Sequence, residues 1–146
     1  MTFPDRIERS IELPHPPDRV WTALTTAEGL AAWFGDRAEI DLRPGGVGTL
    51  TWTAEGHCQD VRVERVEEPT AFGFTWRIDG LPRDDPRRTY VEFVLEPTPT
   101  GTRLHLVETG FAQLGPDEHG AHRGNTQGWA RELGDLAAHL DAVHAA

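Results

Sequence analysis

Residues 17–35 read PDRVWTALTTAEGLAAWFG, a pattern that predicts two short helices in succession. Pro17 suits the first position of a helix, and Asp18 favours the positive end of its dipole. Thr26 can cap the second helix, and Gly35 can end it. Each helix gathers apolar residues on one side: Val20, Trp21 and Leu24 in the first, Leu30, Trp33 and Phe34 in the second. Both helices therefore have a face that must be buried.

The chain on either side of these helices alternates between apolar and polar residues, as half-buried strands do. Before them, residues 6–13 place three apolar residues and Arg9 on one face. After them, six segments separated by turn residues keep the same period: 37–42, 47–54, 58–66, 71–79, 89–96 and 102–110. Because the connections are short, these six segments are expected to form an antiparallel meander. The charged, proline-rich stretch 80–88 is expected to be a solvated hairpin tip.

The last segment, residues 116–145, is expected to form one long helix that lies on the sheet. Its apolar stripe consists of Trp129, Leu133, Leu136, Ala137 and Leu140. Nearer its start, the same side carries polar groups: His122, Asn125 and Thr126. Gly120, Gly124 and Gly128 fall on roughly the opposite face. Since each glycine costs about 1 kcal/mol relative to alanine in a helix interior, the first half should be the less stable part.

The inner face of the predicted sheet carries more bulk than one helix stripe can cover. Six aromatic residues compete for this space: Trp33, Trp52, Phe74, Trp76, Phe93 and Trp129. Their rings are more easily accommodated around a cavity than in a two-layer slab, so we expect a hollow interior. On the last strand, Glu108 shares parity with Leu106 and is expected to point inward beside the core.

The composition fits one compact domain over residues 1–146, and cytoplasmic location is expected. The chain has 14 basic residues, all of them arginine, and 24 acidic residues, so its net charge is -10. Such a surface repels phosphate backbones and anionic lipids, so neither nucleic-acid binding nor membrane insertion is expected. The longest apolar run, residues 30–34, is too short for a membrane span. Cys58 is the only cysteine, which excludes an intrachain disulfide and a thiolate zinc cluster.

Several local motifs carry a family resemblance that extends over nearly the whole chain. They are VWTALT (20–25) running into EGLAAWF (28–34), RPGG (43–46), GTRLHL (101–106), and GW (128–129) with Leu133, Leu136 and Leu140. Together they resemble the START-like helix-grip (SRPBCC) superfamily, and more narrowly the AHSA1-like group, the single-domain relatives of the C-terminal domain of the Hsp90 ATPase activator. The resemblance implies an α+β fold in which a curved seven-stranded antiparallel sheet grips a long C-terminal helix, with two short helices between strands 1 and 2.

The resemblance also implies a pocket between sheet and helix. The expected function is binding of a small hydrophobic or amphipathic molecule there, by a carrier or sensor. The expected ligand-binding residues are Trp33, Phe34, Trp52, Phe74, Trp76, Phe93, Leu106, Glu108, His122, Asn125, Trp129 and Leu133. No catalytic residue is assigned, because the superfamily has no universal catalytic motif. No cofactor or metal is expected, since the i, i+3 pair His119 and His122 has no third ligand at a matching step.

Two other functions remain open. An enzyme of the aromatase or cyclase kind would use His122 and Glu108 to assist proton transfer on a bound ring system. An interaction module would use the outer surface on a chaperone or another protein. Direct stimulation of Hsp90 is not expected, because the true activator has a separate N-terminal domain that this chain lacks. The oligomeric state is left open, a homodimer included.

Arg9 and Glu108 could meet if the first and last strands are neighbours. An unpaired buried charge is costly, which favours an ion pair between them. Such a pair would either anchor a polar group of the ligand or simply neutralise itself. In the other interpretation, Arg9 reaches solvent at a strand edge.

Overall fold

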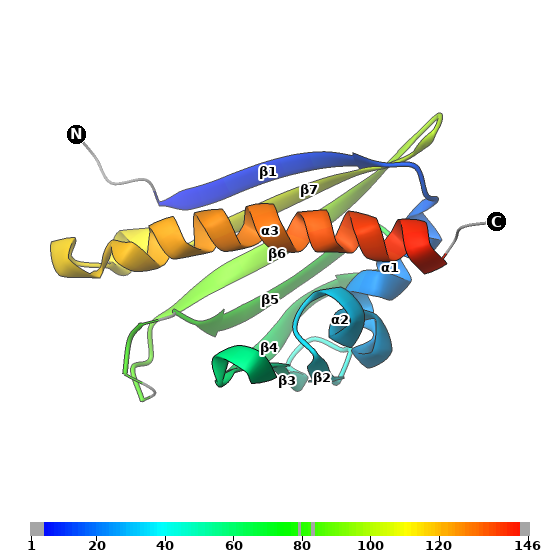
Figure 1. Ribbon diagram of the computed structural model, residues 1–146. Helices are drawn as coiled ribbons and strands as arrows, with labels where there is room; N and C mark the ends of the chain where they lie inside the picture. The colour runs from blue at the N-terminus through cyan, green and yellow to red at the C-terminus, as the bar shows by residue number, and fades with distance from the viewer. Residues whose placement is uncertain (1–4, 79, 83, 144–146) are drawn as a thin grey trace.

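Seven antiparallel strands form one sheet, and the C-terminal helix lies across one of its faces (Figure 1). This computed structural model describes residues 5–78, 80–82 and 84–143. In chain order the strands are β1 (Arg6–Leu13), β2 (Arg37–Ile40), β3 (Val47–Trp52), β4 (His57–Glu67), β5 (Ala71–Arg77), β6 (Arg88–Thr98) and β7 (Gly101–Thr109). Their order in the sheet is β1-β7-β6-β5-β4-β3-β2. The strands β2 to β7 form the meander, and β1 pairs with β7 at one edge. The predicted fold class is confirmed, and the described strand ends lie within two residues of those expected.

The two short helices are α1 (Pro17–Thr25) and α2 (Ala27–Trp33), and they lie between β1 and β2. Pro17 occupies the first turn of α1. The Thr26 hydroxyl caps α2 by accepting a hydrogen bond from the Gly29 backbone N–H at 3.0 Å. Both helices bury the apolar side that their sequences predicted. The helix α2 contacts β2, and both short helices contact α3 (Gly120–Val143), whose C-terminal end lies beside α1 in Figure 1.

The core lies between α3 and the inner face of the sheet. Fully buried apolar side chains include Leu24, Phe72, Phe93, Leu104, Leu106, Phe111, Leu136 and Leu140. The predicted stripe of α3 is confirmed, because Trp129, Leu133, Leu136 and Leu140 are buried against this face and Ala137 is partly buried. Each such Leu or Phe contributes roughly 1.5–3 kcal/mol relative to an exposed position. Burial of the stripe therefore holds α3 in place.

The first and last strands pair as expected, but the ion pair between Arg9 and Glu108 does not form. Ile7 lies opposite Glu108 in the register of β1 and β7. Glu108 points inward, as predicted, and is fully buried. Arg9 lies on the edge strand, where its exposed guanidinium donates only to the Glu8 carbonyl at 3.2 Å among the hydrogen bonds of the described chain. The solvent interpretation of Arg9 is the one that the structure bears out.

The C-terminal helix begins later than its sequence suggests. Pro116–Glu118 form a 3-10 turn, and α3 starts at Gly120. The Glu118 side chain accepts a hydrogen bond from the Gly115 backbone N–H at 2.9 Å, which fixes this separate turn. The predicted last residues of the helix, 144 and 145, lie outside the described residues.

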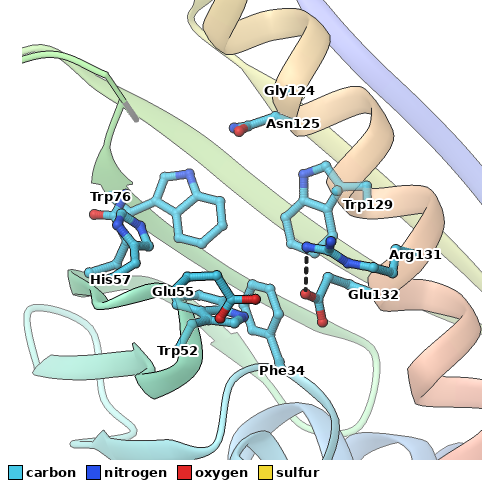
Figure 2. Close-up of a pocket in the computed structure, with 12 residues that line it drawn as sticks. Phe34, Trp52, Glu55, His57, Trp76, Gly124, Asn125, Trp129, Arg131 and Glu132 are labelled. Atoms are coloured by element: carbon cyan, nitrogen blue, oxygen red, sulfur yellow. Dashed lines mark ion pairs between the residues drawn. The ribbon is translucent and has the colours of Figure 1, made fainter.

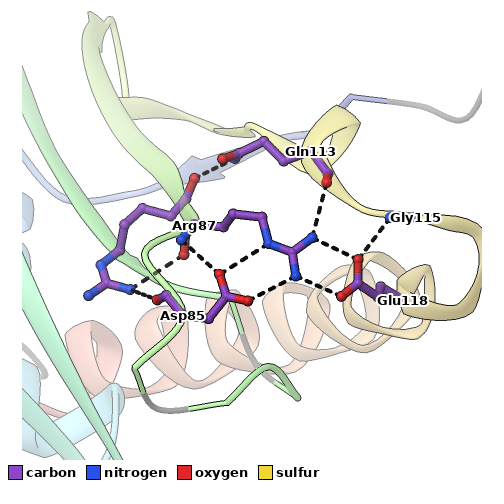
Figure 3. A network of polar contacts seen from close by, with 6 residues as sticks. Asp85, Arg87, Gln113, Gly115 and Glu118 are labelled. Carbon is purple, nitrogen blue, oxygen red and sulfur yellow. Dashed lines mark hydrogen bonds and ion pairs between the residues drawn. The ribbon is translucent and has the colours of Figure 1, made fainter.

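A polar network ties the connection between β5 and β6 to the turn before α3 (Figure 3). The Arg87 guanidinium donates to both Glu118 oxygens, each at 2.7 Å. It also donates to the Asp85 carboxylate at 2.9 and 3.1 Å and to the Gln113 carbonyl at 3.2 Å. The prediction of a merely solvated tip for 80–88 is therefore wrong for Arg87, because its planar fork of N–H groups matches two carboxylates at once. Arg83 of that stretch lies outside the described residues.

Loss of this network is expected to destabilise the fold less at acid pH than at neutral pH. Hydrogen bonds from Arg87 lower the pKa of Glu118 from 4.5 to about 2 and that of Asp85 from 3.8 to about 2. A carboxyl whose pKa falls on folding stabilises the fold above its unfolded pKa, and this stabilisation is lost as pH falls through the folded value. The melting temperature of Arg87→Gln should thus lie below that of the wild type by a constant gap at neutral pH.

We expect the gap to narrow as the pH falls from 4.5 to about 2. Thermal melts monitored by circular dichroism across this range would measure it. The exposed Arg19 on α1 offers the control, since Arg19→Gln removes the same charge from a side chain that makes no ion pair or hydrogen bond with the described residues. A gap for Arg87→Gln that stays constant down to pH 2 would contradict the assignment.

Candidate functional site

A pocket of about 410 Å³ lies between the first half of α3 and the sheet (Figure 2). We call it the aromatic pocket. Its lining residues are Phe34, Trp52, Glu55, His57, Gln59, Trp76, Gly124, Asn125, Gly128, Trp129, Arg131 and Glu132. They come from the end of α2, from β3, β4 and β5, from the 3-10 turn Thr53–Glu55, and from α3. The volume lies in the range of small-molecule sites.

Four aromatic rings form the wall of this pocket. Phe34 stacks on Trp129 with ring centroids 5.2 Å apart, and Trp129 stacks on Trp76 at 5.7 Å. Trp52 meets Phe34 edge to face at 5.3 Å. Figure 2 shows Trp76 and Trp129 opposite each other, with Phe34 and Trp52 beside them. Offset stacks and edge contacts of this kind add about 0.5–1.5 kcal/mol per pair, so the rings support one another in fixed positions.

A buried carboxylate behind the wall orients two of these rings. Glu108 Oε1 accepts from Trp129 Nε1 at 2.8 Å, and Glu108 Oε2 accepts from Trp76 Nε1 at 2.8 Å. Thr89 donates to Oε2 at 2.5 Å, and the Asn125 amide N–H group reaches both oxygens at 3.1 Å. Neutral N–H and O–H donors thus replace the cation that the sequence suggested. Within the described chain, no ion pair involves Glu108.

Polar groups complete the lining of the pocket. Gln59 is 3% exposed, and its amide nitrogen donates to the Arg77 carbonyl at 2.9 Å. Its Oε1 has no hydrogen-bond partner among the described residues. Burial raises the pKa of Glu132 above 4.5, while neighbouring Arg131 opposes that shift. Arg131 is 3.8 Å from Glu132 and keeps 69% of its side chain exposed. The pocket therefore combines an apolar wall with a few acceptors.

The structure brings together some of the residues that the sequence proposed as a site. Five of them line the aromatic pocket: Phe34, Trp52, Trp76, Asn125 and Trp129. Glu108 lies directly behind it. Four others belong to the packed core: Phe74, Phe93, Leu106 and Leu133. Trp33 stacks on Phe34 and donates to the Ala23 carbonyl at 2.8 Å, so it supports the wall from behind.

The interior is less hollow than expected. Phe72, Phe74 and Phe93 contact one another at centroid distances of 5.6–6.4 Å and fill the middle of the inner face. The space that remains lies at the side of the helix, where Gly124 and Gly128 leave room. The sequence placed these glycines roughly opposite the apolar stripe, and Gly124 is indeed exposed and Gly128 half-buried, yet both also line the pocket.

His122 does not line the aromatic pocket. Its ring contacts Phe111 edge to face at 5.0 Å, and its Nε2 lies 3.3 Å from the Arg6 carbonyl. The acid and base pair of His122 with Glu108 is thus not assembled at the pocket. In the described residues, no group of three or more His, Cys, Asp or Glu side chains is placed to hold a metal ion.

Sequence reasoning missed several lining residues: Glu55, His57, Gln59, Arg131 and Glu132. Two of them carried a usable signal. Gln59 has the parity of Val61 and Val63 on β4, so it had to point inward, as Glu108 does. Glu132 lies three residues after Trp129, which puts it beside the buried stripe of the helix.

The comparisons with known proteins agree on the fold. A family model described as Activator of Hsp90 ATPase homolog 1-like protein matches residues 14–141. No curated protein gives a significant match. MLL2253 from Mesorhizobium loti is 28% identical, with a TM-score of 0.81 over 94% of this chain and 97% of that one. CalU16 from Micromonospora echinospora is 25% identical, with a TM-score of 0.67 over 92% and 74% of the two chains.

A more distant structure is PFC0360w, an HSP90 activator from Plasmodium falciparum. It is 20% identical, and its TM-score is 0.75 over 92% of this chain and 95% of that one. At this identity the likeness shows a common fold alone. Separately, none of the helices in the described chain is long and apolar enough to cross a membrane.

Proposed function

Because the chain belongs to the Activator of Hsp90 ATPase homolog 1-like family, we propose that its aromatic pocket binds a small hydrophobic or amphipathic molecule. The observation that carries this proposal is the pocket of about 410 Å³ between α3 and the sheet, with four aromatic rings in its wall. An apolar concavity with a few convergent polar groups is the usual form of a small-molecule site. The protein would act as a carrier or sensor of this ligand.

The physical gain comes from covering the rings. Trp52 and His57 are only half-buried, so a flat ligand placed against them would remove further apolar surface from water. Each 100 Å² of apolar surface removed from water contributes roughly 2.5 kcal/mol before the entropic cost of binding. The indoles that Glu108 holds in position need little reordering when a ligand enters.

Filling the pocket is expected to weaken ligand binding strongly. A Cβ at Gly128 would meet nothing within 4 Å, and the residue lines the pocket, so Gly128→Leu would place its side chain in the ligand's space. Gly134→Leu is the matched control, because this exposed glycine of α3 also has free space around it and does not line the pocket. Either change raises helix propensity by roughly 0.8 kcal/mol, so lost binding would not reflect lost folding.

The measurement is tryptophan fluorescence during titration with a panel of lipophilic molecules, supported by native mass spectrometry for co-purified ligands. We expect saturable quenching for the wild type and Gly134→Leu, and at least about tenfold weaker binding for Gly128→Leu. A flat response of the wild type to the whole panel would overturn the proposal. So would equal affinity of all three proteins.

A further inference from the structure

We propose that the ligand of the aromatic pocket carries a protonated amine, on an aromatic or alkyl body. This inference rests on the proposed function and names the chemical class that the site would take. It follows from the balance of donors, acceptors and charges around the pocket.

Three hydrogen-bond donors of the pocket lining are already used. The indole N–H groups of Trp76 and Trp129 both point to the carboxylate of Glu108, at 2.8 Å each. The Asn125 amide nitrogen also donates to this carboxylate. A ligand that offers only acceptors, such as a carboxylate or a ketone, would therefore find no donor among these three groups, and Arg131, which also lines the pocket, lies 3.8 Å from Glu132.

Acceptors, by contrast, remain available. Gln59 Oε1 is a buried oxygen with no partner in the described chain, and its residue lines the pocket. The Gln59 amide nitrogen is fixed on the Arg77 carbonyl, which leaves the oxygen as the free end of the amide. Asn125 likewise keeps its carbonyl oxygen, since its nitrogen is bound to Glu108. A buried acceptor without a partner is destabilising, and a ligand N–H group would recover this loss.

The charges favour a cation. Glu55 and Glu132 line the pocket, and Glu108 lies behind its wall without an ion-pair partner in the described chain. The one lining residue with a permanent positive charge, Arg131, is largely exposed and 3.8 Å from Glu132. Aromatic rings attract a cation through their electron-rich faces, and more strongly where the site is buried. Hydrogen bonding, charge and aromatic character thus point to the same ligand class.

Three probes with one ring system isolate this preference: naphthylmethylammonium, naphthylmethanol and naphthoate. Isothermal titration calorimetry at neutral pH would compare their affinities for the wild type. We expect the ammonium to bind at least about tenfold tighter than the alcohol, and the carboxylate to bind weakest. Glu132→Gln should reduce the preference for ammonium over alcohol by about three- to tenfold.

Glu39→Gln is the charge-matched control, because Glu39 is exposed on β2 and does not line the pocket. Its preference for the ammonium should equal that of the wild type, and an equal loss in this control would overturn the inference. Equal or tighter binding of the alcohol or the carboxylate would also overturn it, yet leave the pocket as a ligand site. If none of the three probes binds, both this inference and the proposed function lose their support.

Discussion

Replacing Glu108 with leucine is expected to destabilise the fold by about 3–5 kcal/mol. The substitution removes one acceptor group that receives five hydrogen bonds from four side chains: Trp76, Thr89, Asn125 and Trp129. The Trp76 N–H also reaches the Thr89 hydroxyl at 3.0 Å, but Trp129 would be left with a buried donor and Asn125 with a half-buried one, and neither has a substitute acceptor. Each such donor costs about 1–3 kcal/mol, more than leucine regains by hydrophobic burial.

Urea denaturation followed by tryptophan fluorescence would measure this loss. Glu39→Leu is the control, because it makes the same change at an exposed strand position and should alter stability by no more than about 0.5 kcal/mol. Glu108→Gln should fall between the two, since it keeps the shape but turns one acceptor into a donor that faces other donors. An unchanged urea midpoint for Glu108→Leu would mean that the network contributes nothing net to stability.

For Glu108, the sequence predicted the position of the side chain but not its hydrogen-bond partners. Strand parity was enough to place this carboxyl inside, because successive residues of a strand point to opposite faces. It could not identify the partners, since hydropathy treats tryptophan as an apolar residue and hides its N–H donor. Arg9 was the obvious candidate for a counterion. Because it lies on the edge strand, its guanidinium instead reaches water, which costs less free energy than burial beside Glu108.

The pocket was harder to predict than the fold. Alternation and helical spacing are local properties, and they located the strands and helices within a few residues. The pocket depends instead on how closely α3 approaches the curved sheet, which is set by ring packing between distant segments such as Phe34, Trp76 and Trp129. The sequence named six competing rings but left out Phe34 and Phe72. It could not show that three phenylalanines fill the centre and leave space beside the glycines of α3.

Trp129→Ala is expected to cost about 3–5 kcal/mol and to abolish ligand binding. Trp129 is 2% exposed, contacts the rings of Phe34, Trp76 and Phe93, and donates to Glu108. The control is Trp52→Ala, at a half-buried ring of the same pocket that makes no hydrogen bond to Glu108. We expect the control to lose binding with a smaller loss of stability, of about 1–2 kcal/mol. Equal destabilisation by the two changes would mean that the ring contacts and the Glu108 hydrogen bond of Trp129 add no stability beyond that of a half-buried ring.

A double-mutant cycle separates the contribution of the Trp129 ring to stability from that of its hydrogen bond to Glu108. Trp129→Phe keeps an aromatic wall but removes the N–H, and in the wild type this leaves Glu108 with one donor fewer. In the Glu108→Leu background the same change removes a donor that has already lost its acceptor, so its cost should fall by about 1–2 kcal/mol. Urea denaturation of the four proteins gives this coupling directly. Strict additivity would mean that the indole acts through packing alone, in which case the carboxylate does not hold the wall of the pocket in place.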